Sequence, residues 1–424
     1  MSPLDSTGDS FNIGTGPLRP DATIMETGVV DLGVYYTKER FEEEREMFGK
    51  VWLNIAETRE IPNPGDWIVR EVKIRSASVI IVRGKDNEIR AFHNVCAHRG
   101  MKLVWDDKGR GGKFACPYHA WIYDSAGALN NIPDEGCFPH VNKSESGLTP
   151  VRSGVWADMV FINLDAKGTQ SLDEFLGPLK DRVRDLPFES YPYAARVASP
   201  IDANWKLAIE AQCEAYHVRA LHSRTVSKML SSKDNPYVHP LHVEFLGAHR
   251  MNSVPRNPDF AMTPEKLVQT FSFMNVVHMV VADTGNQDRP EATFAGHPDI
   301  NVTKANLLGN DQFVLFPHFI FHVALGGWWL HRFWPIAPGK CEWEAVYHFE
   351  RPNSLRTVFA TQYGLALNRD TLMEDNLALV QQQSVMASGA KKFAQFGEQE
   401  AMCKHLAAVS EAVANDLSLP LAAE

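Results

Sequence analysis

Residues 96–119 read CAHRGMKLVWDDKGRGGKFACPYH and carry the strongest structural signal in the chain. The stretch begins with Cys96 and His98 and, after seventeen further residues, ends with Cys116 and His119. Two short loops therefore each offer one thiolate and one imidazole. Such a set can complete a tetrahedral zinc site. It can equally hold a two-iron, two-sulfide cluster, with both cysteines on one iron and both histidines on the other.

The residues around these loops predict a small antiparallel β-domain. Residues 38–50 favour a charged surface helix, and residues 155–164 a final strand that closes the domain. Short apolar runs with Pro/Gly or Asp/Asn turns between several of them predict strands at 66–72, 78–82, 89–94, 113–116 and 121–123. Both Cys/His pairs thus lie in loops between strands.

A second region begins near residue 171 and predicts helices around an antiparallel sheet, which is an α+β domain. The expected elements are helices at 171–184, 202–217 and 369–417, and strands at 312–323, 328–334 and 341–350. Alternation within 313–323 points Phe319, Phe321 and Val323 one way and His318, Ile320 and His322 the other. We expect one of these faces to line a cavity.

Residues 204–222, NWKLAIEAQCEAYHVRALH, form a second candidate site. Glu214 and His217 are three residues apart and would share a helix face. His217 and His222 are five apart, which on a regular helix separates them by about 140°. Both histidines can reach one metal only if the helix is interrupted, and we predict that interruption at 218–221.

Two histidines need a carboxylate to form the facial triad typical of non-haem iron(II) sites, which leaves positions open for dioxygen. Asp375, in the sequence LMEDNLALVQQQ that ends at Gln383, is the candidate. Taken alone, each of these three residues would be an ordinary histidine or a solvated helix carboxylate. Their occurrence downstream of the Cys/His loops favours a metal site.

In this order the two sets of residues resemble the large (α) subunit of Rieske non-haem iron ring-hydroxylating oxygenases, over about residues 38–395. The resemblance implies one Rieske [2Fe-2S] cluster per chain on the four residues of the Cys/His loops. It also implies one mononuclear Fe(II) per chain on His217, His222 and Asp375. Glu214 occupies the family position that links an iron-ligand histidine to a cluster histidine of the neighbouring subunit, which implies a homotrimer.

The resemblance also implies the domain organisation. Residues 1–37 would form an N-terminal arm and the start of the catalytic domain, 38–166 the Rieske domain, and 167–424 a helix-grip (START-like) catalytic domain. The chain departs from the family at Ala211, where many members have Asn close to the iron. The segment from Asn204 to His217 is also one residue shorter than in naphthalene dioxygenase-like proteins. Together with Glu214, this resembles the branch that includes choline, carnitine and glycine-betaine oxygenases and many phenylpropionate-type members.

The implied activity is that of a terminal oxygenase, which hydroxylates an aromatic or bulky apolar compound by mono- or dioxygenation. The sequence lacks a G-x-G-x-x-G fingerprint, so we expect a separate NAD(P)H-dependent reductase, with or without a ferredoxin, to dock near His98 and His119. A β subunit is compatible with this arrangement. Two alternatives stay open: oxidation of a quaternary ammonium compound, and a Rieske electron carrier fused to a ligand-binding module.

Composition bounds the remaining possibilities. The 424 residues are 44% hydrophobic and 22% charged, as in globular proteins, and a net charge of −10 disfavours nucleic-acid binding. No targeting or membrane segment is recognisable, so we expect a cytoplasmic chain.

The cysteines outside the loops are expected to be buried or inert: Cys137, Cys213, Cys341 and Cys403. Four tryptophans are candidates for a cation–π cage: Trp328, Trp329, Trp334 and Trp343.

Overall fold

A computed structural model describes residues 11–12, 17–18, 20–260, 294, 296–324 and 327–418. The chain divides into two compact units, one of residues Arg45–Phe175 and one of residues Met1–Glu44 with Leu176–Glu424. The sequence predicted the corresponding boundaries at residues 38 and 166. Within the described ranges, no helix is both long and apolar enough to cross a membrane.

The Arg45–Phe175 unit is an antiparallel β-domain, as predicted. A seven-stranded sheet has the order β4-β13-β12-β7-β6-β5-β8, and a separate three-stranded sheet has the order β11-β10-β9. The strands are β4 Leu53–Glu57, β5 Asp66–Val72, β6 Ala77–Arg83, β7 Ile89–His93, β8 Lys108–Arg110, β9 Lys113–Ala115, β10 Ile122–Asp124, β11 Leu129–Asn131, β12 Pro150–Trp156 and β13 Met159–Asn163.

The predicted single strand at 155–164 is wrong, because this segment is the turn and second strand of the β12–β13 hairpin. Ala157 and Asp158 form the turn with φ of 48° and 61°. A two-residue turn with both φ values positive matches the right-handed twist of paired strands. The hairpin pairs Trp156 with Met159 and thereby closes the sheet against β4.

The larger unit is built on a seven-stranded antiparallel sheet of order β14-β20-β19-β18-β17-β16-β15. Its strands are β14 Tyr193–Ile201, β15 His242–Leu246, β16 His249–Pro255, β17 Leu308–Leu315, β18 Phe319–Ala324, β19 Gly327–Ala337 and β20 Lys340–Phe349. The strand residues of β17 and β18 are buried throughout, so both faces of the sheet's centre are covered.

The two faces of β18 have different neighbours, as the alternation predicted. Phe321 packs on Phe313 and Phe188 on one face. His322 lies on the other face, where its ring stacks on Trp329. The predicted strand at 312–323 is nevertheless two strands, β17 and β18. Pro317 lies in the turn between them, where a residue without a backbone N–H is tolerated.

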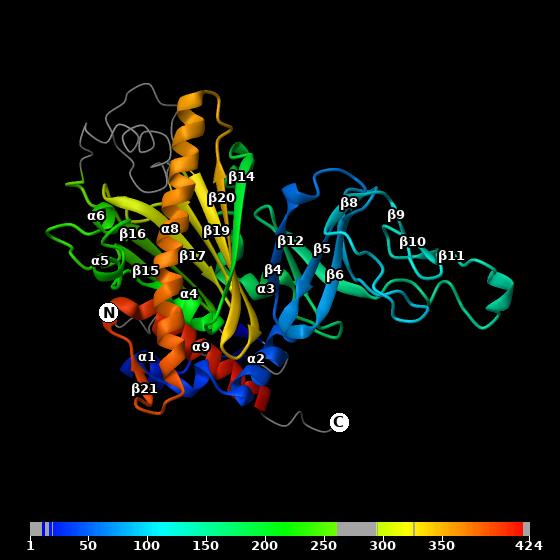
Figure 1. The fold of residues 1–424 in the computed structure, drawn as a ribbon, viewed down its shortest axis with the longest axis horizontal. Helices are drawn as coiled ribbons and strands as arrows, with labels where there is room; N and C mark the ends of the chain where they lie inside the picture. Colours follow the sequence, from blue (N-terminus) through cyan, green and yellow to red (C-terminus); the bar gives the residue numbers. More distant parts are fainter. Residues whose placement is uncertain are drawn as a thin grey trace. The chain divides into compact units, whose positions relative to one another are not determined.

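A long helix, α8, runs along this second face of the sheet (Figure 1), where Leu365 and Leu372 pack against Trp329 and Tyr347. The predicted single helical run at 369–417 is wrong, since α8 and α9 are separated by strand β21.

The helices are α1 Ala22–Thr27, α2 Lys38–Lys50, α3 Leu172–Leu176, α4 Trp205–Cys213, α5 Val218–Leu221, α6 Ser227–Leu230, α8 Leu355–Met386 and α9 Ala401–Ser418. Two short pairs complete the topology: β1 Phe11–Asn12 with β2 Pro17–Leu18, and β3 Val29–Asp31 with β21 Phe393–Gln395.

Candidate metal site and cluster loops

Helix α4 carries the first part of the site and is fixed at its start to α8. Asn204 caps the helix, its Oδ1 accepting from the backbone N of Lys206 at 2.9 Å. The backbone N of Asn204 donates to Oε1 of Gln383 on α8, at 2.8 Å. Gln383, which the sequence singled out only by its position after Asp375, therefore holds α4 and α8 together.

Helix α4 ends earlier than predicted, at Cys213, because Glu214 adopts an extended backbone (φ −140°, ψ 166°). The Glu214 carboxylate then accepts from the backbone N–H groups of Tyr216 and His217 and starts a new turn. An interruption was predicted at 218–221; Val218–Leu221 is itself the short helix α5, and this helix ends at Leu221, directly before His222. Glu214 and His217 likewise do not share a face of one helix.

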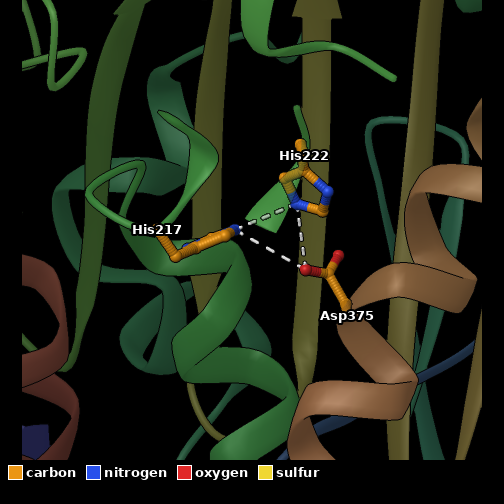
Figure 2. Close-up of side chains that lie close together, drawn as sticks. All are labelled: His217, His222 and Asp375. Carbon is orange, nitrogen blue, oxygen red and sulfur yellow. Dashed lines mark hydrogen bonds and ion pairs between the residues drawn. The ribbon is translucent and has the colours of Figure 1, made fainter. Parts of the chain in front are cut away.

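His217 and His222, at the two ends of the single-turn helix α5, meet Asp375 of α8 at a common point (Figure 2). Nε2 of His222 lies 3.0 Å from Oδ1 of Asp375 and 3.1 Å from Nε2 of His217, and the third separation is 3.5 Å. His222 and Asp375 are buried, whereas the His217 side chain is 22% exposed. A single ion could contact all three residues, and no second group of this kind is found among the described residues.

Two further carboxylates fix the orientation of the histidine rings. Nδ1 of His217 donates to Glu214, and Nδ1 of His222 donates to Oε2 of Glu374 at 2.8 Å. Glu374 also accepts from the hydroxyl of Thr225 at 2.6 Å. With both Nδ1 atoms protonated, the neutral rings turn their Nε2 lone pairs toward Asp375. Metal-binding histidines are commonly held in this way by carboxylates.

The donor set fits a cation. Two Nε2 lone pairs and a carboxylate oxygen converge, and the buried Oδ1 of Asp375 accepts no hydrogen bond within the described ranges. Burial alone would lower the pKa of His222, but the adjacent carboxylates of Asp375 and Glu374 outweigh it and raise the pKa. The site therefore attracts positive charge, which a metal ion would supply.

The role of Glu374 was missed in the sequence, where it was noted only as the neighbour of Asp375. Adjacent helix residues point about 100° apart, so the pair Glu374–Asp375 can serve two positions around one histidine. The remaining oxygen of Asp375, Oδ2, accepts from Nε2 of Gln212 at 3.3 Å. Each predicted metal residue thus has a supporting contact.

The two Cys/His loops have the same backbone design. The N–H of Gly100 donates to the carbonyl of Cys96 at 3.0 Å, and that of Ala120 donates to the carbonyl of Cys116 at 2.9 Å. Gly100 and Ala120 both have positive φ, 71° and 56°. Each loop therefore turns sharply four residues after its cysteine and presents its cysteine and histidine side chains in the same order.

The geometry of the four side chains favours the two-iron alternative over zinc. Nδ1 of His98 lies 3.1 Å from Nδ1 of His119, so the histidines form a pair. Ligands of one tetrahedral zinc would all lie within about 4 Å of one another. Among the described residues, these cysteines and histidines form no such single-ion group, which leaves room for a cluster between the two pairs.

Other residues of the loops support the pairs. Sγ of Cys96 is 3.2 Å from the hydroxyl of Tyr123, which also accepts from the backbone N of Ala97 at 3.0 Å. The His98 ring stacks on Trp121 with 4.8 Å between centroids. Both cysteines are buried, whereas both histidines are partly exposed. The histidine edge is therefore the side of the cluster loops that a redox partner can approach.

A cavity of about 160 Å³ adjoins His217, His222 and Asp375. Residues of β17 to β20 on the face under α8 also line it, among them His322, Trp329 and Tyr347. The prediction that one face of 313–323 lines a cavity therefore holds for the His322 face. Of the four tryptophans proposed for a cation–π cage, only Trp329 is among the described lining residues.

The remaining cysteines were expected to be buried or inert, and three of the four are buried. Cys213, Cys341 and Cys403 are buried, whereas Cys137 is exposed. Cys137 lies in the 3-10 helix Glu135–Cys137, where its thiol contacts Asp134 at 3.2 Å. For Cys137, the expectation that it is inert stays a prediction.

Two buried charged residues of α4, Lys206 and Glu210, have partners outside the helix that are not metal residues. Lys206 contacts the carboxylate of Glu44, and the hydroxyl of Tyr35 donates to Glu210 at 3.0 Å. Burial raises the pKa of Glu210 to about 8 from 4.5. A raised carboxyl pKa means that the folded chain binds this proton more tightly than the unfolded chain does, so stability falls as pH rises between these values.

The variant Glu210→Gln is expected to remove this pH dependence. Between about pH 6 and about pH 8 the wild-type chain should lose stability by up to about 1.4 kcal/mol per pH unit from this group, and the variant should not. Denaturant unfolding midpoints at the two pH values measure the difference, with the exposed Glu189→Gln as control. Equal slopes for Glu210→Gln and wild type would contradict the assignment.

Comparison with known proteins agrees with this description. A family model for the ring hydroxylating alpha subunit (catalytic domain) matches residues 188–414, which is more than half of the chain. The chain belongs to this family. A second model, the Rieske [2Fe-2S] domain, matches residues 51–144. These matches confirm the resemblance to Rieske oxygenase α subunits and the α+β fold class. They also confirm that a Rieske domain is combined with a mononuclear-iron type of catalytic domain.

Three relatives illustrate the family. The chain is 33% identical over 208 residues to the 2-aminobenzenesulfonate 2,3-dioxygenase subunit alpha of Alcaligenes sp, covering 47% of this chain and 51% of that protein. It is 34% identical over 197 residues to the carnitine monooxygenase oxygenase subunit of Acinetobacter pittii, covering 45% and 51%. The chain thus spans about half the length of these curated relatives. The crystal structure of naphthalene 1,2-dioxygenase from Rhodococcus sp. has a TM-score of 0.69 at 21% identity, covering 92% of this chain and 95% of that one.

Proposed function

We propose that the chain is the terminal oxygenase component of a multicomponent Rieske oxygenase, which hydroxylates a small organic compound with dioxygen and electrons from NAD(P)H. The observation that carries the proposal is the convergence of His217, His222 and Asp375. Among the described residues, no hydrogen-bond donor points at the Oδ1 atom of Asp375, where these three residues meet. Facial sites of two histidines and one carboxylate suit non-haem iron(II) and leave coordination positions open. Family membership supports the same assignment.

Each set of residues has a distinct task in this proposal. Cys96, His98, Cys116 and His119 would hold the cluster, and the three converging residues would hold the iron. When bound, the cluster supplies single electrons and the iron supplies a site for dioxygen. The chain's own groups orient these ligands, since Glu214 and Glu374 fix the two histidine rings.

Glu214 is also proposed to connect subunits. One of its oxygens contacts Nδ1 of His217, and its carboxylate end lies at the rim of the cavity residues. In a homotrimer this carboxylate would accept a hydrogen bond from a cluster histidine of the next subunit. A reductase, with or without a ferredoxin, would dock at the partly exposed His98 and His119 edge. A cytoplasmic location and an accompanying β subunit are compatible with the proposal.

The alternative substrate class is a quaternary ammonium compound, as the name of the carnitine monooxygenase relative suggests. The described cavity lining contains only two of the aromatic rings that a cation–π cage needs, Trp329 and Tyr347. The aromatic class therefore has the stronger support. A pure electron carrier with a ligand-binding module would not need the converging metal residues.

The proposal is tested by supplying the anaerobically reconstituted chain with a compatible reductase, NADH and isotopically labelled dioxygen. The expected result is substrate-dependent oxygen uptake and label in the organic product. Mass spectrometry distinguishes one retained oxygen atom from two. Uptake that releases only reduced oxygen species with every organic compound in an aromatic and trimethylammonium panel would overturn the oxygenase assignment in favour of the electron carrier.

The variant Glu374→Gln tests the support of His222. A glutamine keeps the size of the side chain but weakens the hold on the Nδ1–H and can present its amide group instead. Changes of this kind next to a metal site cost about 10–100-fold in metal affinity or activity. Ferrous iron titration should show that loss, whereas Asp370→Asn, an exposed position on the same helix, should not. Unchanged iron affinity in Glu374→Gln would contradict the role.

A further inference from the structure

We infer that the substrate of this site is a neutral compound of about one aromatic ring that carries an N–H or O–H donor, and that His322 selects it by accepting that hydrogen bond. The inference rests on the proposed function, because it takes the cavity beside the metal residues to be the substrate site. Four features of the cavity wall carry it: the position of His322, its open acceptor, the charge of the lining and the volume.

His322 lies in a continuous row across the sheet. In the strand register it is opposite Gln312 on β17 and Trp329 on β19, and Trp329 is opposite Tyr347 on β20. All four residues line the same cavity as the metal residues. Substrate held against this row would lie between the sheet and the metal residues contributed by α8 and the α4–α5 region.

His322 offers an acceptor that the described protein does not use. Its Nδ1 lies 3.2 Å from Oδ1 of Asn310, an oxygen that can only accept, so Nδ1 carries the proton. Nε2 is then a lone pair, and this atom is buried without a hydrogen-bond partner. The residue is only 6% exposed. An unpaired acceptor in a buried site is unfavourable, and a substrate donor would satisfy it.

His331, the other histidine of the cavity wall, cannot bind an anionic substrate, because its ring is uncharged. Nδ1 of His331 accepts from Nε1 of Trp343 at 3.0 Å, so the ring is held neutral with its proton on Nε2. Burial lowers the pKa of His331 to about 3, and burial together with His331 lowers the pKa of His322 well below its usual value. Both rings are therefore uncharged at neutral pH.

The described lining disfavours an anionic substrate, since its carboxylates, Glu214 and Asp375, repel an anion. None of the described lining residues is Lys or Arg, so a carboxylate or sulfonate would have no cationic partner. A buried unpaired charge is strongly unfavourable. A quaternary ammonium group has no N–H for His322, and one face of Trp329 is already covered by the His322 ring at 4.5 Å. The volume of about 160 Å³ is close to the roughly 150 Å³ of an engineered cavity that holds benzene.

Calorimetric binding to the oxidised holoprotein, with no reductase present, tests the inference. The probes are aniline, toluene, benzoate and phenyltrimethylammonium, which share one ring and differ in the group that they present. The variants are His322→Phe, which removes the acceptor, and His322→Gln, which restores one on a shorter side chain. The measured quantity is the ratio of aniline to toluene affinity, since differences in hydration between the probes cancel when variants are compared.

The expected ratio falls about tenfold in His322→Phe, the size of one lost hydrogen bond, and recovers in part in His322→Gln. Benzoate and phenyltrimethylammonium should bind at least about tenfold more weakly than aniline to the wild-type chain. An equal aniline-to-toluene ratio in all three proteins, or preferred binding of either charged probe, would overturn the inference. Because no turnover is needed, these results are independent of whether labelled oxygen enters a product.

Discussion

Replacing Asp375 by alanine is expected to remove the mononuclear iron and reduce turnover more than the 10–100-fold that changes to supporting residues cost. Asp375 contributes the carboxylate of the three converging ligands, and its Oδ1 accepts no hydrogen bond from any described residue. Without it, His217 and His222 would form a two-ligand site. Iron analysis should show the loss of one iron per chain, while the visible spectrum of the cluster is unchanged.

The exposed Asp370 on the same helix provides the control for this experiment. Asp370 pairs with Arg369 at the surface, so Asp370→Ala should retain both the iron and the activity. Circular dichroism checks that α8 is intact in both variants. Wild-type iron content and turnover in Asp375→Ala would show that another group is the carboxylate ligand.

Replacing Cys116 by serine is expected to have an effect of similar size on activity through the other cofactor. Cys116 is buried at the start of the second cluster loop, and the softer thiolate is the ligand that an iron–sulfur cluster requires. The variant should lose the visible absorption of the cluster and the ability to accept electrons from a reductase. Turnover should fall below detection, because the mononuclear iron alone has no supply of electrons.

Cys137→Ser is the matched control, because Cys137 is exposed and lies outside both cluster loops. It should retain the full cluster spectrum. The mononuclear site offers an internal check in Cys116→Ser: ferrous iron should still bind to His217, His222 and Asp375. A normal cluster spectrum in Cys116→Ser would contradict the assignment of this residue.

The sequence predicts much of the β-domain because its signals are local. Strand β5 at Asp66–Val72 has the predicted bounds, and the other predicted strands around the cluster loops shift by only one or two residues. Alternating burial and turn residues determine such strands over a few positions. The segment 155–164 was harder, because Ala157 is not a typical residue for a turn with positive φ.

The interruption of α4 could not be located from spacing alone. The spacing of His217 and His222 predicts a break between the two histidines, whereas α4 already ends at Cys213, before both of them. Glu214 fixes the break because its carboxylate binds the backbone of the next turn and the His217 ring at once. Glutamate is compatible with a helix interior, so its residue type gave no warning.

Contacts between distant parts of the chain were the least predictable. The bond from His222 to Glu374 joins residues 152 positions apart. Its existence depends on how α8 is rotated over the sheet, which the helix pattern does not specify. The hydrogen bond between Asn204 and Gln383 has the same origin, although both residues were noted in the sequence. In contrast, Pro317 was a visible signal for the turn between β17 and β18.

The central claim, that His217, His222 and Asp375 hold a ferrous ion with open coordination positions, is tested most directly by adding nitric oxide to the anaerobic ferrous chain. Electron paramagnetic resonance should then show the signal of a high-spin iron–nitrosyl complex, in addition to the reduced cluster. The signal should be absent in Asp375→Ala. A chain that binds only zinc, or that gives the same nitrosyl signal without Asp375, would contradict the account.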